Sequence, residues 1–202
     1  VGGGFAYGSL GMTHHATEDI AIMRALPNMT VLAPGDPVEA AAATRAIIEQ
    51  PGPCYLRLGR AGEQVVHHEP IDFRIGRAIR VREGHDLTLI STGGLLPTAV
   101  AAADELAENG ITVRLLSMHT VKPLDMDAVL VAAHETGAIA TLEEHSVLGG
   151  LGGAVAEVLA ECGDVKVPFI RIGAPSTFAL TAGDQDYLRS TFGLSKDSVV
   201  KR

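Results

Sequence analysis

The chain has 202 residues, 47% of them hydrophobic, and a formal net charge of −8 at pH 7. This composition is sufficient for a packed core, and its acidic balance argues against binding to nucleic acid or to an anionic membrane surface. The two cysteines lie far apart, so we expect neither a zinc site nor a disulfide framework. The sequence contains no apolar run of membrane-spanning length and no signal peptide, and we therefore expect a cytoplasmic location, where thiols stay reduced.

The first sixty residues predict the closing part of a parallel α/β unit. Apolar spacing indicates a helix over 18–28, followed by a short buried strand over 29–34. A second helix, over 36–50, begins with Asp36 as its N-cap and a proline at its first position. The next strand covers 53–60. We therefore expect residues 1–60 to complete one α/β domain.

A linker is expected over 61–72, where no helical period is present and a proline interrupts the chain. His67 and His68 form an adjacent pair in it. Further ligands at metal-binding spacing are absent, so we expect both histidines to be solvated.

A second domain is expected over 73–202, where strands and helices alternate regularly. Helices about ten residues long between strands favour a sheet that is parallel apart from its first, edge strand. The predicted fold class is therefore α/β, with a three-layer α/β/α domain. The expected strands cover 73–84, 86–92, 111–118, 138–144 and 167–173, and the expected helices cover 96–110, 123–137, 152–163 and, as the last one, 184–193.

A glycine-rich turn joins the strand over 138–144 to the following helix. Its glycines, at 149, 150, 152 and 153, could cradle a phosphate at the helix N-terminus or simply allow close packing, which we favour. The spacing is not that of a dinucleotide fingerprint, because Val155 stands where the third glycine would be. The adjacent Glu143, Glu144 and His145 could form a charged contact surface, or a catalytic dyad that lacks a third member.

Two arginines near the end of the strand over 53–60 are candidates for anion binding. Arg57 and Arg60 are three positions apart, so simple pleating directs them to different sides. Arg60 lies at the carboxyl end, where parallel sheets usually bind ligands, and could hold a phosphate through two hydrogen bonds. An ordinary surface arginine is the alternative. Hydrolase chemistry is excluded, since no nucleophile elbow is present and Cys54 has the pattern of a buried strand residue.

The order of several motifs resembles transketolase. "LGMTHHATEDIAIMRALPN" and "GPCYLRLGR" are similar to the closing half of its pyrimidine-binding domain, in which the family string DGPTH corresponds to LGMTH here. "VKPLD", "TGAIATLEEHSVLGGLGGAVAEVL" and "FIRIGAP" resemble its C-terminal domain. The doubled histidine and "TEDIAIMRALPN" look most like transketolases that are split into two subunits.

The resemblance implies an enzyme that depends on thiamine diphosphate and Mg²⁺ and moves a two-carbon ketol unit between sugar phosphates. His14 matches the histidine of DGPTH, which implies that it contacts hydroxyl and carbonyl oxygens of the donor as a catalytic residue. Arg60 matches the arginine that binds the substrate phosphate. His15 matches no family role, and packing at the helix entry is sufficient to explain it.

Several family parts are absent or altered. Leu10 replaces an aspartate that reads a sugar hydroxyl, and Gly2 replaces a phosphate-contacting histidine, so a less polar or differently shaped substrate is expected. The pyrimidine-activating glutamate and the diphosphate–Mg²⁺ motif are not in this sequence, and we assign no cofactor-binding or metal-ligating residue to it. The abrupt start at Val1 suggests the interior of a longer polypeptide, with a processed N-terminus as the alternative.

The expected partner is therefore an N-terminal transketolase section or subunit carrying the diphosphate-binding domain, in a homodimeric or heterotetrameric assembly. The chain alone is expected to be inactive and to bind no cofactor. Two other enzyme classes share the layout, the β subunits of 2-oxoacid dehydrogenases and deoxyxylulose phosphate synthase. A non-catalytic assembly module is a further alternative.

Overall fold

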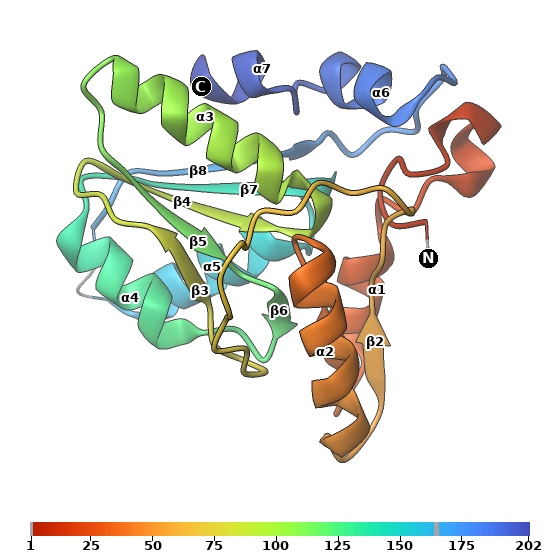
Figure 1. Cartoon of the computed structure of the whole chain (residues 1–202), viewed down its shortest axis with the longest axis horizontal. Coiled ribbons are helices and arrows are strands. Elements are labelled where there is room, and N and C mark those ends of the chain that lie inside the picture. The colour runs from red at the N-terminus through yellow and green to blue at the C-terminus, as the bar shows by residue number, and fades with distance from the viewer. Residues whose placement is uncertain (1, 164–165) are drawn as a thin grey trace.

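The computed structural model describes residues 2–163 and 166–202, which form two β-sheets with helices around them (Figure 1). The larger sheet has five strands in the order β3-β5-β4-β7-β8, and the smaller has three in the order β2-β1-β6. The strands are β1 (Thr30–Leu32), β2 (Cys54–Leu56), β3 (Ile79–Arg82), β4 (Leu87–Thr92), β5 (Val113–Ser117), β6 (Thr120–Lys122), β7 (Ile139–Ser146) and β8 (Phe169–Ala174).

The helices largely follow the apolar periods of the sequence. They are α1 (Asp19–Ala25), α2 (Pro37–Glu49), α3 (Leu96–Glu108), α4 (Met126–Glu135), α5 (Leu151–Glu161), α6 (Gln185–Thr191) and α7 (Lys196–Val200). Short 3₁₀ turns η1 (Gly8–Leu10), η2 (Met12–His14) and η3 (Gly93–Leu95) occur before α1 and α3. None of the described helices combines the length and apolarity needed to cross a membrane.

The larger sheet confirms the predicted α/β class. Its strands are parallel except β3, which pairs antiparallel with β5 at one edge. Successive β4 residues serve opposite faces: Leu89 packs in a core with α3, α6 and α7, whereas Ile90 packs in a core with α4 and α5. Figure 1 shows these two helical layers on either side of the sheet.

The smaller sheet contains one strand that the sequence did not predict. β6 follows β5 directly and pairs antiparallel with β1. The second half of the chain therefore contributes one strand to the smaller sheet, whose other two strands come from the first sixty residues. Val121 of β6 is buried with Ile20 and Val31 in a third core. Three residues are too few to give a period of their own, which explains the omission.

Two other expectations need correction. The helix over 184–193 is not the last, because α7 follows it, capped by Ser195 Oγ. His67 is not solvated: its side chain is 8% exposed, and its Nε2 lies 2.8 Å from Glu39 Oε1. Its neighbour His68 is exposed, as expected.

The N-cap of α2 explains why His67 is buried. Asp36 Oδ1 accepts a hydrogen bond from the Glu39 amide, as predicted for an N-cap. Its other oxygen, Oδ2, accepts from the amides of Val66 and His67, each at 2.9 Å. One buried carboxylate thus caps the amino terminus of α2 and also holds the segment after β2 against that helix.

Candidate functional site

The segment before α1 forms a loop that is closed at its base. Gly4 and Ala16 exchange two backbone hydrogen bonds, of 2.8 and 2.9 Å, and residues 5–15 lie between them. Gly4 has a φ of +62°, and a Cβ there would lie 2.6 Å from the Glu144 side chain. Only glycine fits this position, so the base of the loop is tied closely to β7. We call residues 5–15 the His14 loop.

The two adjacent histidines of this loop have different surroundings. His14 is exposed, and its Nδ1 lies 3.1 Å from the hydroxyl of the preceding Thr13. His15 is half-buried, with its ring edge-on to Phe5 at a centroid distance of 5.2 Å and its Nε2 3.3 Å from the Gly8 carbonyl. His14 therefore presents an imidazole to solvent, whereas His15 packs into the loop.

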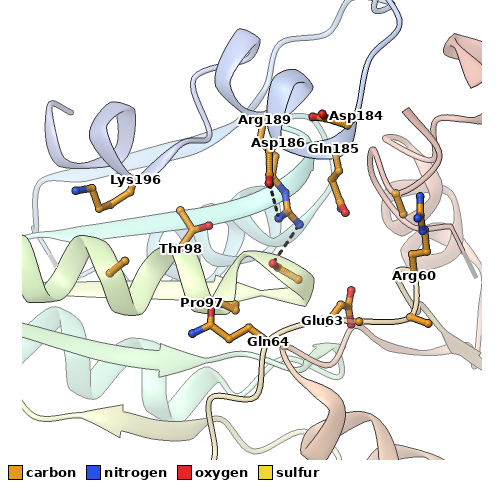
Figure 2. A pocket seen from close by; sticks show the side chains of 16 residues that line it. Arg60, Glu63, Gln64, Pro97, Thr98, Asp184, Gln185, Asp186, Arg189 and Lys196 are labelled. Atoms are coloured by element: carbon orange, nitrogen blue, oxygen red, sulfur yellow. Dashed lines mark hydrogen bonds and ion pairs between the residues drawn. The ribbon is translucent and has the colours of Figure 1, made fainter. Parts of the chain in front are cut away.

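Arg60 lines a hollow of about 670 Å³ between the segment after β2, the start of α3 and α6 (Figure 2). In Figure 2 Arg60 stands at one end of this hollow and Lys196 at the other. His14 is not among the lining residues, so the structure does not bring the two predicted site residues into one pocket. The polar side chains of the lining are Arg60, Glu63, Gln64, Thr98, Asp184, Gln185, Asp186, Arg189 and Lys196.

The two other cations of this hollow, Arg189 and Lys196, are already paired. Arg189 Nε donates to Glu144 Oε2 at 2.8 Å, and Lys196 Nζ lies 2.6 Å from Glu105 Oε2. Burial, together with the Glu144 charge, raises the pKa of Glu63, although Arg189 opposes this effect. No ion pair among the described residues involves Arg60. Arg60 is therefore the cation of this hollow that is available to an anionic ligand.

Arg57 points away from this hollow into the protein, as the three-residue spacing predicted. Its Nε donates to Asp19 Oδ2 at 2.8 Å, and its Nη2 donates to the carbonyls of Ala16 at 2.7 Å and Glu144 at 2.9 Å. Burial alone would raise the pKa of Asp19, but the charge and hydrogen bonds of Arg57 outweigh it and hold that pKa below its usual value. Burial and the hydrogen bond to Asp19 raise the pKa of Tyr55 to about 12.

Glu143, Glu144 and His145 do not form a charged contact surface, because all three are buried at the carboxyl end of β7. Glu144 Oε1 accepts from the Phe5 amide at 2.7 Å and from Gln185 Nε2 at 2.9 Å. His145 Nε2 lies 3.3 Å from the Ala21 amide, and its Nδ1 lies 2.7 Å from the Ser146 carbonyl. Burial and the Arg57 charge lower the pKa of His145, which favours the neutral ring.

The glycine-rich turn holds an internal carboxylate. The amides of Leu151 and Gly152 donate to Glu143 at 2.6 and 2.8 Å. A Cβ at Gly150 would lie 2.0 Å from Glu143 Oε2. The turn therefore serves close packing, and the amides that could have held a phosphate are occupied by the protein itself. Within residues 2–163 and 166–202, no group of three or more histidine, cysteine or acidic side chains could hold a metal ion.

Sequence patterns drew attention to Arg57 and Glu144 without indicating what they contact. Their hydrogen bond joins positions 87 residues apart, and no spacing along the chain reports such a contact. The available signal was chemical: an arginine and two glutamates at strand ends, where buried charges need partners.

Two family models match the chain. One, described as transketolase, C-terminal domain, covers residues 76–199, and the other, described as transketolase, pyrimidine binding domain, covers residues 1–62. The chain belongs to the transketolase family. This confirms the resemblance drawn from the motifs.

Relatives of this transketolase chain include proteins named as transketolase subunits. It is 43% identical over 191 residues to a 6-deoxy-6-sulfo-D-fructose transketolase subunit of Clostridium sp. (strain MSTE9), covering 95% of this chain and 58% of that protein. It is 39% identical over 202 residues to an apulose-4-phosphate transketolase subunit of Phocaeicola vulgatus, covering 100% of this chain and 64% of that protein. The chain thus spans about three fifths of the length of these relatives.

A solved structure described as a split gene transketolase, inactive beta4 tetramer, superposes with a TM-score of 0.88 at 39% identity. The superposition covers 95% of this chain and 62% of that one. The two-sheet arrangement described above is therefore the arrangement of a known transketolase subunit.

Proposed function

We propose that this chain is the C-terminal part of a thiamine diphosphate-dependent transketolase that transfers a two-carbon ketol unit between sugar phosphates. Membership of the family and two relatives named as transketolase subunits support this proposal. The observation that carries it is the placement of His14. It stands exposed on a loop pinned at its base, while the adjacent His15 is packed inside that loop.

In this proposal His14 contacts hydroxyl and carbonyl oxygens of the ketose donor, and Arg60 binds the terminal phosphate. An imidazole can donate or accept a hydrogen bond, and a guanidinium matches a phosphate through two parallel hydrogen bonds. Both side chains are exposed. We propose residues 1–60 as the end of the pyrimidine-binding domain, 61–72 as a linker and 73–202 as the C-terminal domain.

The substrate is proposed to be less polar at one position than a usual sugar phosphate. Leu10 is 58% exposed on the His14 loop and cannot accept a hydrogen bond from a sugar hydroxyl. Gly2 has a φ of +93°, and a Cβ there would lie 2.6 Å from the Tyr7 ring, so no phosphate-binding side chain fits. Arg60 then supplies the anion contact, and the terminal group could be a phosphate or, as the name of one relative indicates for that protein, a sulfonate.

The residues of this chain do not fit the diphosphate end of the cofactor. The backbone amides best suited to a phosphate, at the start of α5, already bind the Glu143 carboxylate. We therefore propose that an N-terminal section or partner chain supplies the diphosphate-binding domain and the Mg²⁺ site. The working enzyme would be a homodimer or heterotetramer in the cytoplasm, and this chain alone would be inactive.

The test compares this chain alone with the chain assembled with its N-terminal partner. Calorimetry should detect Mg²⁺-dependent binding of thiamine diphosphate only in the assembly, which should also transfer a two-carbon unit from a ketose phosphate to an aldose phosphate. Tight cofactor binding by the isolated chain would contradict the proposed division of the site. An assembly that decarboxylates a 2-oxoacid and transfers no ketol unit would favour the alternative enzyme classes, and one without either activity would favour an assembly module.

A further inference from the structure

The carboxyl end of β7 is bonded to the segment that surrounds the His14 loop at four points. The Phe5 amide donates to Glu144 Oε1 at 2.7 Å, at the start of the loop. Beyond its end, the Ser146 amide donates to the Thr17 carbonyl at 2.7 Å. His145 Nε2 lies 3.3 Å from the Ala21 amide in the first turn of α1, and Arg57 connects the Glu144 carbonyl to the loop base. In the first three of these contacts the two partners lie more than 120 positions apart in the sequence. Arg57 lies 41 positions from Ala16 and 87 positions from Glu144.

Arg57 is the centre of this arrangement because its guanidinium reaches three elements at once. One of its nitrogens, Nη2, donates to the carbonyl of Ala16, the residue that closes the His14 loop, and to the carbonyl of Glu144 in β7. Its Nε donates to Asp19 in α1, which also accepts from the Tyr55 hydroxyl in β2. A planar guanidinium can make these contacts simultaneously, whereas a lysine ammonium cannot reproduce the same fork.

The cluster contains two ion pairs, Arg57 with Asp19 and Arg189 with Glu144, and its charges are largely excluded from water. Arg57 and Glu144 are 7% and 2% exposed, and the side chain of Asp19 is 13% exposed. Arg189 pairs with the second oxygen of Glu144 from the side of α6. A buried hydrogen-bonded pair of this kind holds its partners in one geometry, because leaving any one of them unpaired is costly.

We propose that Arg57 and Glu144 are positioning residues that fix the His14 loop against the carboxyl end of β7, so that the C-terminal sheet sets the orientation of the catalytic imidazole. This inference rests on the proposed function only for the role of His14. The rigidity of the loop is a separate property and can be measured without any activity. Among the described residues, the His14 side chain has a hydrogen bond to Thr13 and none to Arg57 or Glu144, so their effect is expected to pass through Phe5 and Ala16 at the ends of the loop.

The variant that tests this is Arg57→Lys, which keeps the charge beside Asp19 but removes the three-way contact. Arg114→Lys is the matched control. Arg114 is also buried, at 3% exposed, and its Nη2 lies 2.8 Å from Glu135 on α4, on the other side of the larger sheet from α3. Glu144→Gln is the second variant, and it keeps the proposal testable if Arg57→Lys fails to fold. It preserves the shape of Glu144 but weakens the contacts of that side chain to Phe5 and Arg189.

The first measurement is hydrogen exchange of the assembled enzyme, followed by mass spectrometry of peptides covering 5–16. Amides held by local structure exchange through local opening, so a released loop should exchange about tenfold faster or more in Arg57→Lys. Peptides of α3 should be unchanged, and Arg114→Lys should leave 5–16 at the wild-type rate. Wild-type exchange of 5–16 in both Arg57→Lys and Glu144→Gln would overturn the proposal.

The second measurement is steady-state kinetics of ketol transfer. A misplaced imidazole should lower kcat about tenfold or more while KM changes about twofold or less, since positioning affects the reacting geometry. The double variant Arg57→Lys/His14→Ala should be no slower than His14→Ala, because the two changes act on the same group. If the factors by which the two single substitutions lower kcat multiply in the double variant, Arg57 does not act through His14. If His14→Ala itself keeps full activity, the proposed function fails, whereas the exchange result still decides whether Arg57 holds the loop.

Discussion

The side chain of Glu143, a residue of β7, reaches the amino-terminal turn of α5, where its Oε1 accepts a hydrogen bond from the Gly152 amide at 2.8 Å. Its Oε2 accepts from Leu151 at 2.6 Å, and the side chain is fully buried. Burial raises the pKa of Glu143 to about 7, although both amide hydrogen bonds oppose the shift. A carboxyl group that is partly protonated near neutral pH thus lies under the most conspicuous glycine turn of the chain.

The pKa of Glu143 predicts a pH dependence of stability. The folded-state value of about 7 lies above the ordinary value of 4.5, so the folded protein holds this proton more tightly than the unfolded chain does. The contribution is fully present below pH 4.5 and is lost as the pH rises through 7. Relative to Glu143→Gln, the wild type should lose up to about 3 kcal/mol of unfolding free energy between these two pH values.

Urea denaturation of both proteins at several pH values measures this difference. Taking the difference cancels shared groups that lie away from Glu143. His145 is not one of them, because its Nδ1 lies 3.7 Å from Glu143 Oε2, so the measured difference belongs to the coupled pair. Glu157→Gln is the matched control on the same helix, because the Glu157 side chain is 62% exposed and should add no comparable slope. A stability difference between wild type and Glu143→Gln that does not vary with pH would contradict the prediction.

His67 predicts a second pH effect, on the segment after β2. The hydrogen bond to Glu39 raises the pKa of His67, while burial opposes it. Because the folded-state pKa is raised, the stabilisation is fully present below the ordinary value of 6.5 and is lost as the pH rises through the folded-state pKa. His67→Asn should therefore cost about 2 kcal/mol of unfolding free energy at pH 5.5, and less as the pH rises.

His68→Asn is the control for this experiment, since His68 is the exposed neighbour of His67. Thermal melting of both variants from pH 5.5 to 9 should show a narrowing deficit for His67→Asn and a constant, small effect for His68→Asn. Equal behaviour of the two variants would mean that the contact with Glu39 does not stabilise the folded protein.

Local patterns predicted most of the fold. The N-cap at Asp36, the alternation of strands and helices after residue 73, and the antiparallel edge strand all follow from spacing within about fifteen residues. β6 escaped prediction because it is three residues long and its partner β1 is about ninety positions away. His67 was misjudged for a related reason: its partner Glu39 belongs to another element, and an adjacent histidine pair in a polar segment contains no sign of it.

The candidate site was less predictable than the fold. Motif resemblance selected His14 and Arg60, but no pattern could indicate that they lie outside a common pocket. The buried cluster of Arg57, Asp19 and Glu144 depends on three segments meeting, which only the packed structure reveals.

Arg60→Ala should weaken substrate binding with little effect on turnover. In the proposed function Arg60 holds a terminal anion remote from the reacting carbons, so it supplies binding in the ground and transition states alike. Loss of a charge-assisted contact of about 2–3 kcal/mol should raise KM for a phosphorylated substrate by roughly 30- to 150-fold. Steady-state kinetics of the assembled enzyme with phosphorylated and unphosphorylated substrates measures this.

Arg45→Ala serves as the matched control, because Arg45 is an exposed arginine on α2 outside the hollow. It should leave both KM values at the wild-type level, and Arg60→Ala should leave KM for the unphosphorylated substrate nearly unchanged. If Arg60→Ala raises both KM values equally, Arg60 does not bind the terminal anion of the substrate.

The adjacent histidines provide the sharpest comparison, since they share the His14 loop and differ in surroundings. His14→Ala should lower kcat by roughly 10²–10³, because a hydrogen bond that strengthens in the transition state is worth about 2.7–4 kcal/mol. It should change the melting temperature little, as the only hydrogen bond of the His14 side chain among the described residues is to Thr13. His15→Ala should do the opposite: it removes the packing against Phe5 and the contact with Gly8, which should cost about 1 kcal/mol of stability and leave turnover of the folded enzyme near wild type.

Kinetics and melting curves of both variants, with activity corrected for the folded fraction, separate these two effects. Wild-type turnover in His14→Ala after that correction would remove the imidazole from the reaction, and equal loss of turnover in both variants would indicate that the shape of the loop matters and no single histidine does.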